Sequence, residues 1–344
     1  MALEVDAAID VLQGLGLYGP GIASGAHTTK NIGSPAANES TYPTTVADVF
    51  GGMSAEPPPR RWKVTYEPDE ALASGWWETY ADDRLRDWLK QLQGFGEPGR
   101  RTHEESFGGR REGLEPGCAW YQPIHFFGYK WGIYIRESCI LQEALRIAAF
   151  GGLTFGAAAQ EPPPSTVVRL LELLRASFYT IFLHEQFHHK VESFGFRLLV
   201  MGSIDRYRPY IKNVYGPTFR TKDCLEESLA NADSYIRLTD SSYMSRIDPV
   251  LRKIVRQYLK HSFKLQPPGY AEATDYLTGP TFQAGLWQLQ SQIFQGKHPG
   301  TIPAHHWWMA PDVFRSLAPV HRKIWMVGQP GTPPLFARAS NPIR

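Results

Sequence analysis

The stretch "TVVRLLELLRASFYTIFLHEQFHHKVESF" (residues 166–194) determines most of the fold that the sequence predicts. Its first half is apolar almost all round, and three prolines (residues 162–164) mark where it begins. A helix of this kind is expected to run through the core of the protein. Charges at Arg169, Glu172 and Arg175 interrupt the apolar run, so it predicts a buried helix rather than a membrane span.

The second half of the stretch carries a possible metal site. His184 and His188 are four residues apart and lie on one face of a helix. Both imidazoles can reach one tetrahedral zinc ion, and Glu185 then lies beside the open position, where it can take a proton from a zinc-bound water. His189 projects about 100° round the helix, and Glu192 lies about 12 Å along it from His184. Helix geometry therefore sets both aside as ligands.

A third ligand is expected from "CLEESLANAD" (residues 224–233) on a second helix. Glu226, three residues after Asp223, fits a capping box at the start of that helix. Glu227 and Asn231 share one face, so Glu227 is predicted to bind zinc and Asn231 to hydrogen-bond a ligand histidine. In the alternative for His184, Glu185 and His188, these residues form a polar end of a buried helix and are satisfied by their neighbours. In the alternative for Glu227, it is an acid on an exposed face of its helix.

The segments "HEQFH" and "ESLAN" resemble the HExxH…ExxAN pattern of gluzincin-type zinc metallopeptidases, most of all the ImmA/IrrE group of intracellular proteases. Many gluzincins carry aspartate where this chain has Asn231, but asparagine is familiar in the ImmA/IrrE version. The resemblance spans residues 184–231 only. It implies Zn²⁺ bound by His184, His188 and Glu227, Glu185 as the general base, and a protein or peptide as the substrate.

Two further expectations concern the substrate. Gluzincins bind a peptide as an added strand on a sheet edge, and Tyr134 and Ile135 could belong either to such an edge or to an internal strand. A donor is also needed for the carbonyl oxygen of the substrate. His305 or His306, in "GTIPAHHWWMAP", is predicted for this catalytic role. Three tyrosines between the zinc helices are expected to be structural: Tyr207, Tyr210 and Tyr215.

The predicted fold class is α+β and mostly helical, with a small antiparallel-type sheet packed on the HExxH helix and the glutamate helix. The expected domains are a mobile or irregular N-terminal arm (1–60), a helix and loop extension (61–117), a zinc metallopeptidase domain (118–300) and a C-terminal extension (301–344). Strands are predicted within 130–136 and at 323–327, and further helices at 76–92, 139–150, from Asp248-Pro249 and near 282–294.

Composition limits the remaining possibilities. A net charge of +2 argues against a nucleic-acid footprint, and the basic row on residues 252–260 is interpreted as a solvated helix face. The three cysteines form no CxxC pair, so we expect no disulfide framework, cysteines that act as small apolar fillers, and a reducing compartment. No secretory signal is visible at the start of the sequence.

These features together predict a soluble cytoplasmic zinc metalloprotease that does not act on membranes or nucleic acids. The alternative is a catalytically silent zinc-bound scaffold or regulatory protein, in which the metal would be structural. The sequence leaves the substrate and the oligomeric state open.

Overall fold

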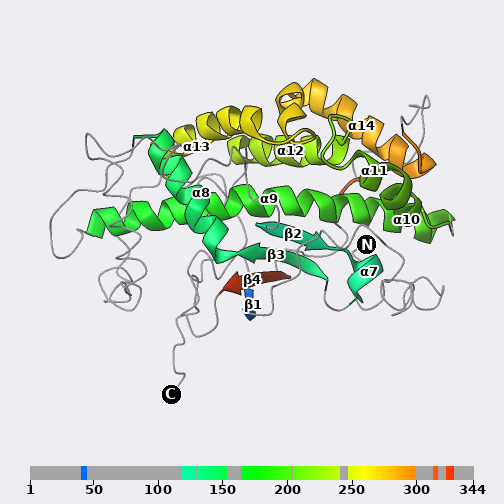
Figure 1. The fold of residues 1–344 in the computed structure, drawn as a ribbon, viewed down its shortest axis with the longest axis horizontal. Coiled ribbons are helices and arrows are strands. Elements are labelled where there is room, and N and C mark those ends of the chain that lie inside the picture. Colours follow the sequence, from blue (N-terminus) through cyan, green and yellow to red (C-terminus); the bar gives the residue numbers. More distant parts are fainter. Residues whose placement is uncertain are drawn as a thin grey trace, which may run out of the picture.

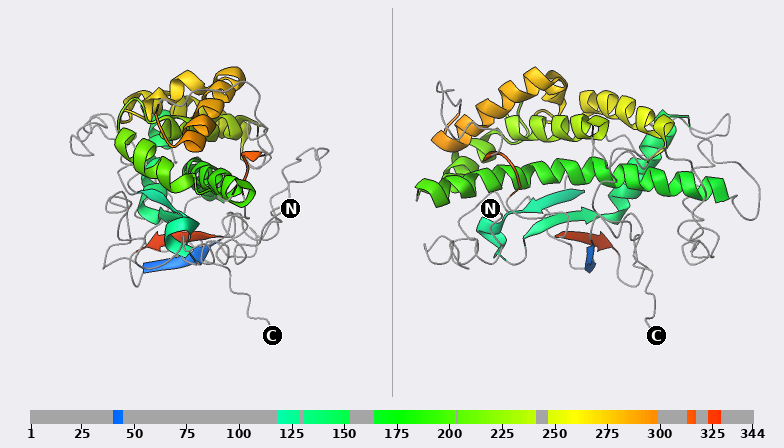
Figure 2. Two further views of the ribbon diagram at one scale, coloured as in Figure 1. Left: turned by 90° about the vertical axis from the view of Figure 1, so that its right-hand side faces the viewer. Right: turned by 180° about the vertical axis from the view of Figure 1, so that it is seen from behind.

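The computed structural model arranges the protein in layers, with the long helix α9 (Pro164–Gly202) between a small sheet and a group of helices (Figure 1). The same order of layers is visible from the side and from behind (Figure 2). The structure describes residues 40–44, 118–128, 131–152, 164–202, 204–240, 247–298, 313–316 and 323–328.

Fourteen further elements accompany α9 in this part of the chain. The strands are β1 (Ser40–Thr44), β2 (Ala119–Gln122), β3 (Gly132–Arg136) and β4 (Ile324–Gly328). The α-helices are α7 (Ile124–Phe127), α8 (Glu137–Phe150), α10 (Tyr207–Tyr210), α11 (Gly216–Thr218), α12 (Leu225–Asp240), α13 (Pro249–Ser262) and α14 (Gly279–Gln295). The π-helix is η4 (Ile211–Tyr215), and the 3₁₀-helices are η6 (Phe263–Leu265) and η7 (Ala271–Tyr276).

The sheet is mixed, with the strand order β1-β4-β3-β2. The pairs β1–β4 and β2–β3 are antiparallel, but β3 and β4 are parallel, so the prediction of an antiparallel-type sheet is wrong at its centre. A parallel pair needs a long crossover connection, and here all the described helices except α7 lie between β3 and β4. The predicted strand at 323–327 is found as β4, whereas β1 lies in the segment expected to be irregular.

Helix α9 contacts other elements on several sides, which explains the apolar residues that it carries between Glu172 and Leu183. It contacts β2 and β3 on one side and α12 on the other, and α8 crosses it from the sheet to the level of α13 (Figure 1). Leu173, Phe178 and Phe182 are fully buried in the larger core. Helix α12, which carries Glu227, therefore packs on α9 and not on the sheet. No helix in the described residues is both long and apolar enough to cross a membrane.

Local signals placed the start of α13 well and the start of α12 less well. Asp248 caps α13 by accepting hydrogen bonds from Val250 N–H (2.8 Å) and Leu251 N–H (3.1 Å), as its position before proline predicts. Helix α12 begins only at Leu225, so Asp223 lies outside it. Gly285 allows α14 to approach α12 closely, because a Cβ there would lie 2.9 Å from Leu229 Cδ2.

The structure contradicts the prediction for two of the cysteines. Cys118 and Cys139 form a disulfide with a Cα–Cα distance of 5.5 Å. The pairing arises because β3 leads directly into α8, which returns Cys139 to the beginning of β2, the partner strand of β3. Cys224 is free and buried. The expectation of a reducing compartment rested on the cysteines being unpaired, and that premise no longer holds.

Some predictions lie outside the described residues. These are the helix at 76–92, most of the segments 1–60 and 301–344, all of 61–117, and the two histidines proposed as oxyanion donors, His305 and His306.

Candidate metal centre

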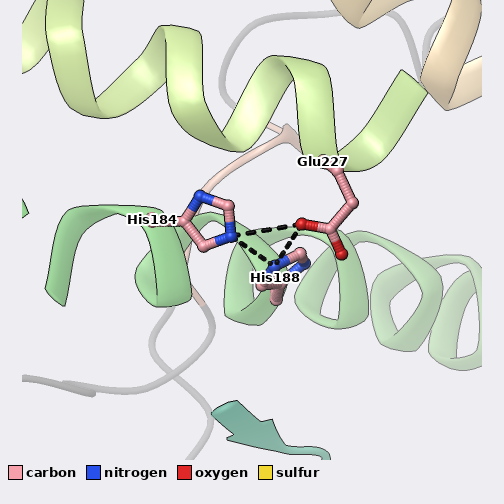
Figure 3. A group of neighbouring side chains, drawn as sticks. All are labelled: His184, His188 and Glu227. Atoms are coloured by element: carbon pink, nitrogen blue, oxygen red, sulfur yellow. Dashed lines mark hydrogen bonds and ion pairs between the residues drawn. The ribbon is translucent and has the colours of Figure 1, made fainter. Parts of the chain in front are cut away.

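Three side chains from α9 and α12 converge on one point (Figure 3). His184 Nε2 lies 3.3 Å from His188 Nε2, and Glu227 Oε2 lies 3.2 Å from the first nitrogen and 3.6 Å from the second. A circle through these atoms has a radius of about 2 Å, the length of a bond from zinc to an imidazole nitrogen or a carboxylate oxygen. The group has the dimensions of a metal site.

Hydrogen bonds on the outer side of each histidine determine which nitrogen faces this point. His184 Nδ1 lies 2.9 Å from Asn231 Oδ1. The amide of Asn231 donates through Nδ2 to Gln266 Oε1 (2.7 Å) and to Tyr270 C=O (3.2 Å), so its oxygen must face the histidine. His184 Nδ1 is therefore the donor, and the Nε2 lone pair points inward. The structure gives Asn231 the partner that the sequence predicts.

Glu226 orients His188 in the same way. His188 Nδ1 lies 2.6 Å from Glu226 Oε1, and Tyr210 donates its hydroxyl to Glu226 Oε2 at 2.6 Å. The prediction that Glu226 caps α12 is wrong. Its buried carboxylate accepts hydrogen bonds from a histidine N–H and a phenol, and not from the N–H groups at the start of the helix. Glu226 thus fixes the tautomer of His188 and leaves its Nε2 lone pair facing inward.

Glu227 is 1% exposed, and its two oxygens have different surroundings. Oε1 accepts a hydrogen bond from the Tyr215 hydroxyl, whereas Oε2 has no hydrogen-bond partner among the described residues. Burial alone would raise the pKa of Glu227, but His188, His184 and Tyr215 more than offset this and lower it to about 2. A buried carboxylate oxygen without a donor is costly. In the alternative in which every polar group is satisfied by its neighbours, only a protonated histidine could serve Oε2, since its nearest nitrogens are His184 Nε2 at 3.2 Å and His188 Nε2 at 3.6 Å.

The charges around the two histidines also favour a cation. Glu185, Glu226 and Glu227 are all buried beside them. Burial lowers the pKa of His188, but the nearby carboxylates, Glu227 above all, raise it to about 10. Two imidazole lone pairs and one carboxylate oxygen directed at one point need a proton or a metal ion between them. The donor set fits zinc, since two histidines and a glutamate are a ligand set of catalytic zinc sites.

Glu185 lies beside the metal group and next to the sheet. It is 7% exposed, and burial raises its pKa, an effect that His184 and His188 oppose. Its carboxylate also accepts a hydrogen bond from the backbone of Tyr121 on β2. On the other side, the Tyr270 ring stacks on His184 with the ring centroids 5.9 Å apart, and its phenol interacts with Glu227. The predicted base therefore lies between the metal group and a strand.

His189 and Glu192 belong to a separate cluster on the face of α9 that packs against β2 and α7. The Glu192 carboxylate accepts hydrogen bonds from the Tyr121 hydroxyl, from Ile124 N–H (3.0 Å), and from the backbone N–H (2.8 Å) and Nδ1 (2.6 Å) of His125. His189 Nδ1 lies 2.7 Å from the Tyr121 hydroxyl. Neither residue is part of the metal group, as helix geometry predicts.

The sequence missed five contributors to the site, of which Gln266 orients Asn231 and Tyr270 stacks on His184. Glu226 was interpreted as a cap, and Tyr210 and Tyr215 were expected to be structural, although their hydroxyls contact the two glutamates. The adjacent acids in "LEES" were a usable signal for Glu226, since two buried carboxylates beside two histidines need different partners. Nothing in the local sequence gives the directions of the tyrosines.

Comparisons of the chain with protein-family models, with curated proteins and with solved structures found no match. The resemblance carried by "HEQFH" and "ESLAN" therefore stays an expectation, and the function is argued from the geometry of the site.

Proposed function

We propose that the protein is a zinc-dependent metallopeptidase that hydrolyses a peptide bond in a protein substrate. The observation that carries the proposal is the convergence of the His184 and His188 Nε2 lone pairs with the unpartnered Oε2 of Glu227, next to the buried carboxylate of Glu185. These three atoms would hold zinc, which when bound polarises a carbonyl group and lowers the pKa of a water molecule.

The residues of the chain have distinct roles in this proposal. Glu185 accepts the proton of the attacking water and passes it to the nitrogen of the leaving amine. The backbone hydrogen bond from Tyr121 holds the carboxylate of Glu185 in place. Asn231 and Glu226 keep both histidines in the tautomer that presents Nε2.

The position of β2 supports an extended peptide as the substrate. Strand β3 lies between β2 and β4, so Tyr134 and Ile135 are on an internal strand, and β2 is one of the two edge strands of the described sheet. Arg136 N–H donates to Cys118 C=O at 2.9 Å, so alternate residues of β2, Ala119 and Tyr121, turn their backbone groups away from β3. A peptide added along this side would pair with Ala119 and with the carbonyl of Tyr121, because Glu185 holds the Tyr121 N–H, and it would therefore lie next to Glu185.

Tyr270 is a further candidate for the donor to the carbonyl oxygen. It is only partly buried, its ring stacks on His184, and its phenol faces both Glu227 and Glu185. Burial and these carboxylates raise the pKa of Tyr270 well above its ordinary value, so the hydroxyl keeps its proton and can donate. His305 and His306 stay predictions for the same role.

The test uses zinc-loaded full-length protein and a peptide library made by digesting a whole proteome, with new amino termini identified by mass spectrometry. Glu185→Gln is the matched control, because it removes the base and leaves all three ligand side chains in place. We expect cleavages with the wild type that are absent with Glu185→Gln and with chelator-treated wild type. Zinc content is measured for both proteins.

Cleavage that is equal in Glu185→Gln would overturn the role of the base. Stoichiometric zinc without any zinc-dependent cleavage would overturn the peptidase proposal and leave the zinc-bound scaffold as the better description.

A further inference from the structure

The π-helix η4 (Ile211–Tyr215) directs two tyrosines at the metal centre. Tyr210 immediately precedes η4 and Tyr215 ends it. In an α-helix, side chains five residues apart point about 140° away from each other. The wider turn of a π-helix brings the same pair to within roughly 50°. The π turn therefore gives the two phenols nearly the same direction, towards the first turn of α12.

Each phenol binds one of the two adjacent glutamates of α12. Tyr210 donates to Glu226 Oε2 at 2.6 Å, and Tyr215 donates to Glu227 Oε1 at 2.5 Å. The second oxygen of each glutamate faces a histidine of α9: Glu226 Oε1 contacts His188 Nδ1, and Glu227 Oε2 lies between the two Nε2 atoms. Each carboxylate is thus held between a tyrosine and α9, but only Glu227 faces the metal point.

We propose that Tyr215 is a positioning residue that makes Glu227 a ligand through one oxygen only, and this proposal rests on the zinc site proposed above. A carboxylate can bind a metal through one or both oxygens. The Tyr215 hydroxyl occupies Oε1 and fixes the carboxylate so that Oε2 alone points between the histidines. A zinc ion held by two nitrogens and one oxygen keeps a position for water or substrate, whereas a two-oxygen glutamate would fill it.

The experiment compares the full-length wild type with Tyr215→Phe and Tyr210→Phe. Tyr210→Phe is the matched control, because it removes a hydroxyl from the same π segment but from a glutamate that contacts only Nδ1 of His188. Zinc affinity is measured by competition with a chromogenic chelator, and coordination by the visible absorption of the cobalt(II)-loaded proteins. Both substitutions are expected to weaken zinc binding about tenfold to a hundredfold. Only Tyr215→Phe should reduce the intense cobalt(II) band of four coordination to the weaker band of a higher coordination number.

An unchanged cobalt(II) spectrum in Tyr215→Phe would overturn the inference, even if its zinc affinity falls, because a purely structural hydroxyl changes affinity without changing coordination. If neither zinc nor cobalt(II) binds the wild type, the proposed zinc site is wrong, and the inference about Tyr215 falls with it. Circular dichroism of the metal-free proteins checks folding. If Tyr215→Phe does not fold, X-ray absorption of the wild-type cobalt(II) protein decides: about four ligand atoms support the inference, and five or six contradict it.

Discussion

Neighbouring turns of helix α9 contribute to two clusters of histidine and glutamate that have opposite characters. We call them the metal-facing cluster (His184, His188, Glu226, Glu227 and Asn231) and the sheet-facing cluster (Tyr121, His125, His189 and Glu192). In the sheet-facing cluster, protein donors satisfy both oxygens of Glu192. In the metal-facing cluster, Glu227 Oε2 has no donor in the described structure, and two imidazole lone pairs face it.

The comparison shows that residue type does not distinguish a structural cluster from a candidate metal site. The convergence of acceptors does so, since the sheet-facing cluster leaves one isolated acceptor without a partner, His125 Nε2, whereas three acceptors meet at one point in the metal-facing cluster. Glu192 receives donors from β2 and α7 and so joins the sheet layer to α9. The metal-facing cluster has acceptors in excess at one point, which is a stable arrangement only with a cation there.

The largest expected effect is on stability and concerns the sheet-facing cluster. Glu192→Gln places an amide among donors that need an acceptor, so the free energy of unfolding should fall by about 3–5 kcal/mol. Urea denaturation of the metal-free protein measures this loss, and zinc stoichiometry should be unchanged. A loss below about 1 kcal/mol would mean that the cluster contributes no more than an ordinary hydrogen bond.

The second effect separates the two clusters by their response to metal. At a free zinc concentration a hundred times the dissociation constant, the wild type should gain about 2.7 kcal/mol of stability, which a chelator removes. Glu227→Gln should lose this gain. Glu192→Gln should show the same gain, although its stability without zinc is lower than that of the wild type. Thermal denaturation with and without zinc gives the comparison, and an equal gain in both variants would contradict it.

The third effect concerns the hydrogen bonds behind the ligands. Asn231→Ala and Glu226→Gln should each weaken zinc binding about tenfold to a hundredfold, since they release the tautomers of His184 and His188. Asp233→Asn is the control on the same helix, because Asp233 pairs with Lys190 at 2.8 Å and does not touch the ligands. Competition with a chelator measures all three affinities. Equal weakening by Asp233→Asn would point to a general loosening of α12.

The smallest effect is the pH dependence of the sheet-facing cluster. Burial would raise the pKa of Glu192, but His125 and Tyr121 hold it below its ordinary value of 4.5. The unfolded chain therefore binds more protons than the folded protein in the window below pH 4.5, and stability rises with pH there. This contribution is complete above pH 4.5 and is lost as the pH falls through the folded pKa. Acid titrations followed by circular dichroism should show a shallower decline for Glu192→Gln than for the wild type.

The parts of the site that lie within one helix could be predicted from the sequence. His184, Glu185 and His188 follow from the spacing on α9, and Asn231 follows from Glu227 four residues earlier on α12. The pattern of apolar residues was also enough to predict the buried helix α9, and the pair Asp248-Pro249 was enough to predict where α13 begins.

The features that depend on packing between distant segments could not be predicted. Tyr210 and Tyr215 reach α12 only because η4 is a π-helix, and an α-helical phase would separate them. The role of Glu226 depends on how α12 crosses α9, and the disulfide between Cys118 and Cys139 depends on the pairing of β2 with β3. Strand β1 joins the sheet from a polar segment whose composition favours loops.

The most direct test of the difference between the two clusters is a crystal structure of zinc-soaked protein with anomalous data collected at the zinc edge. We predict one strong anomalous peak about 2 Å from His184 Nε2, His188 Nε2 and Glu227 Oε2, and none beside His189 or Glu192. The absence of a peak between the three ligand atoms, or a zinc ion bound in the sheet-facing cluster instead, would contradict the account.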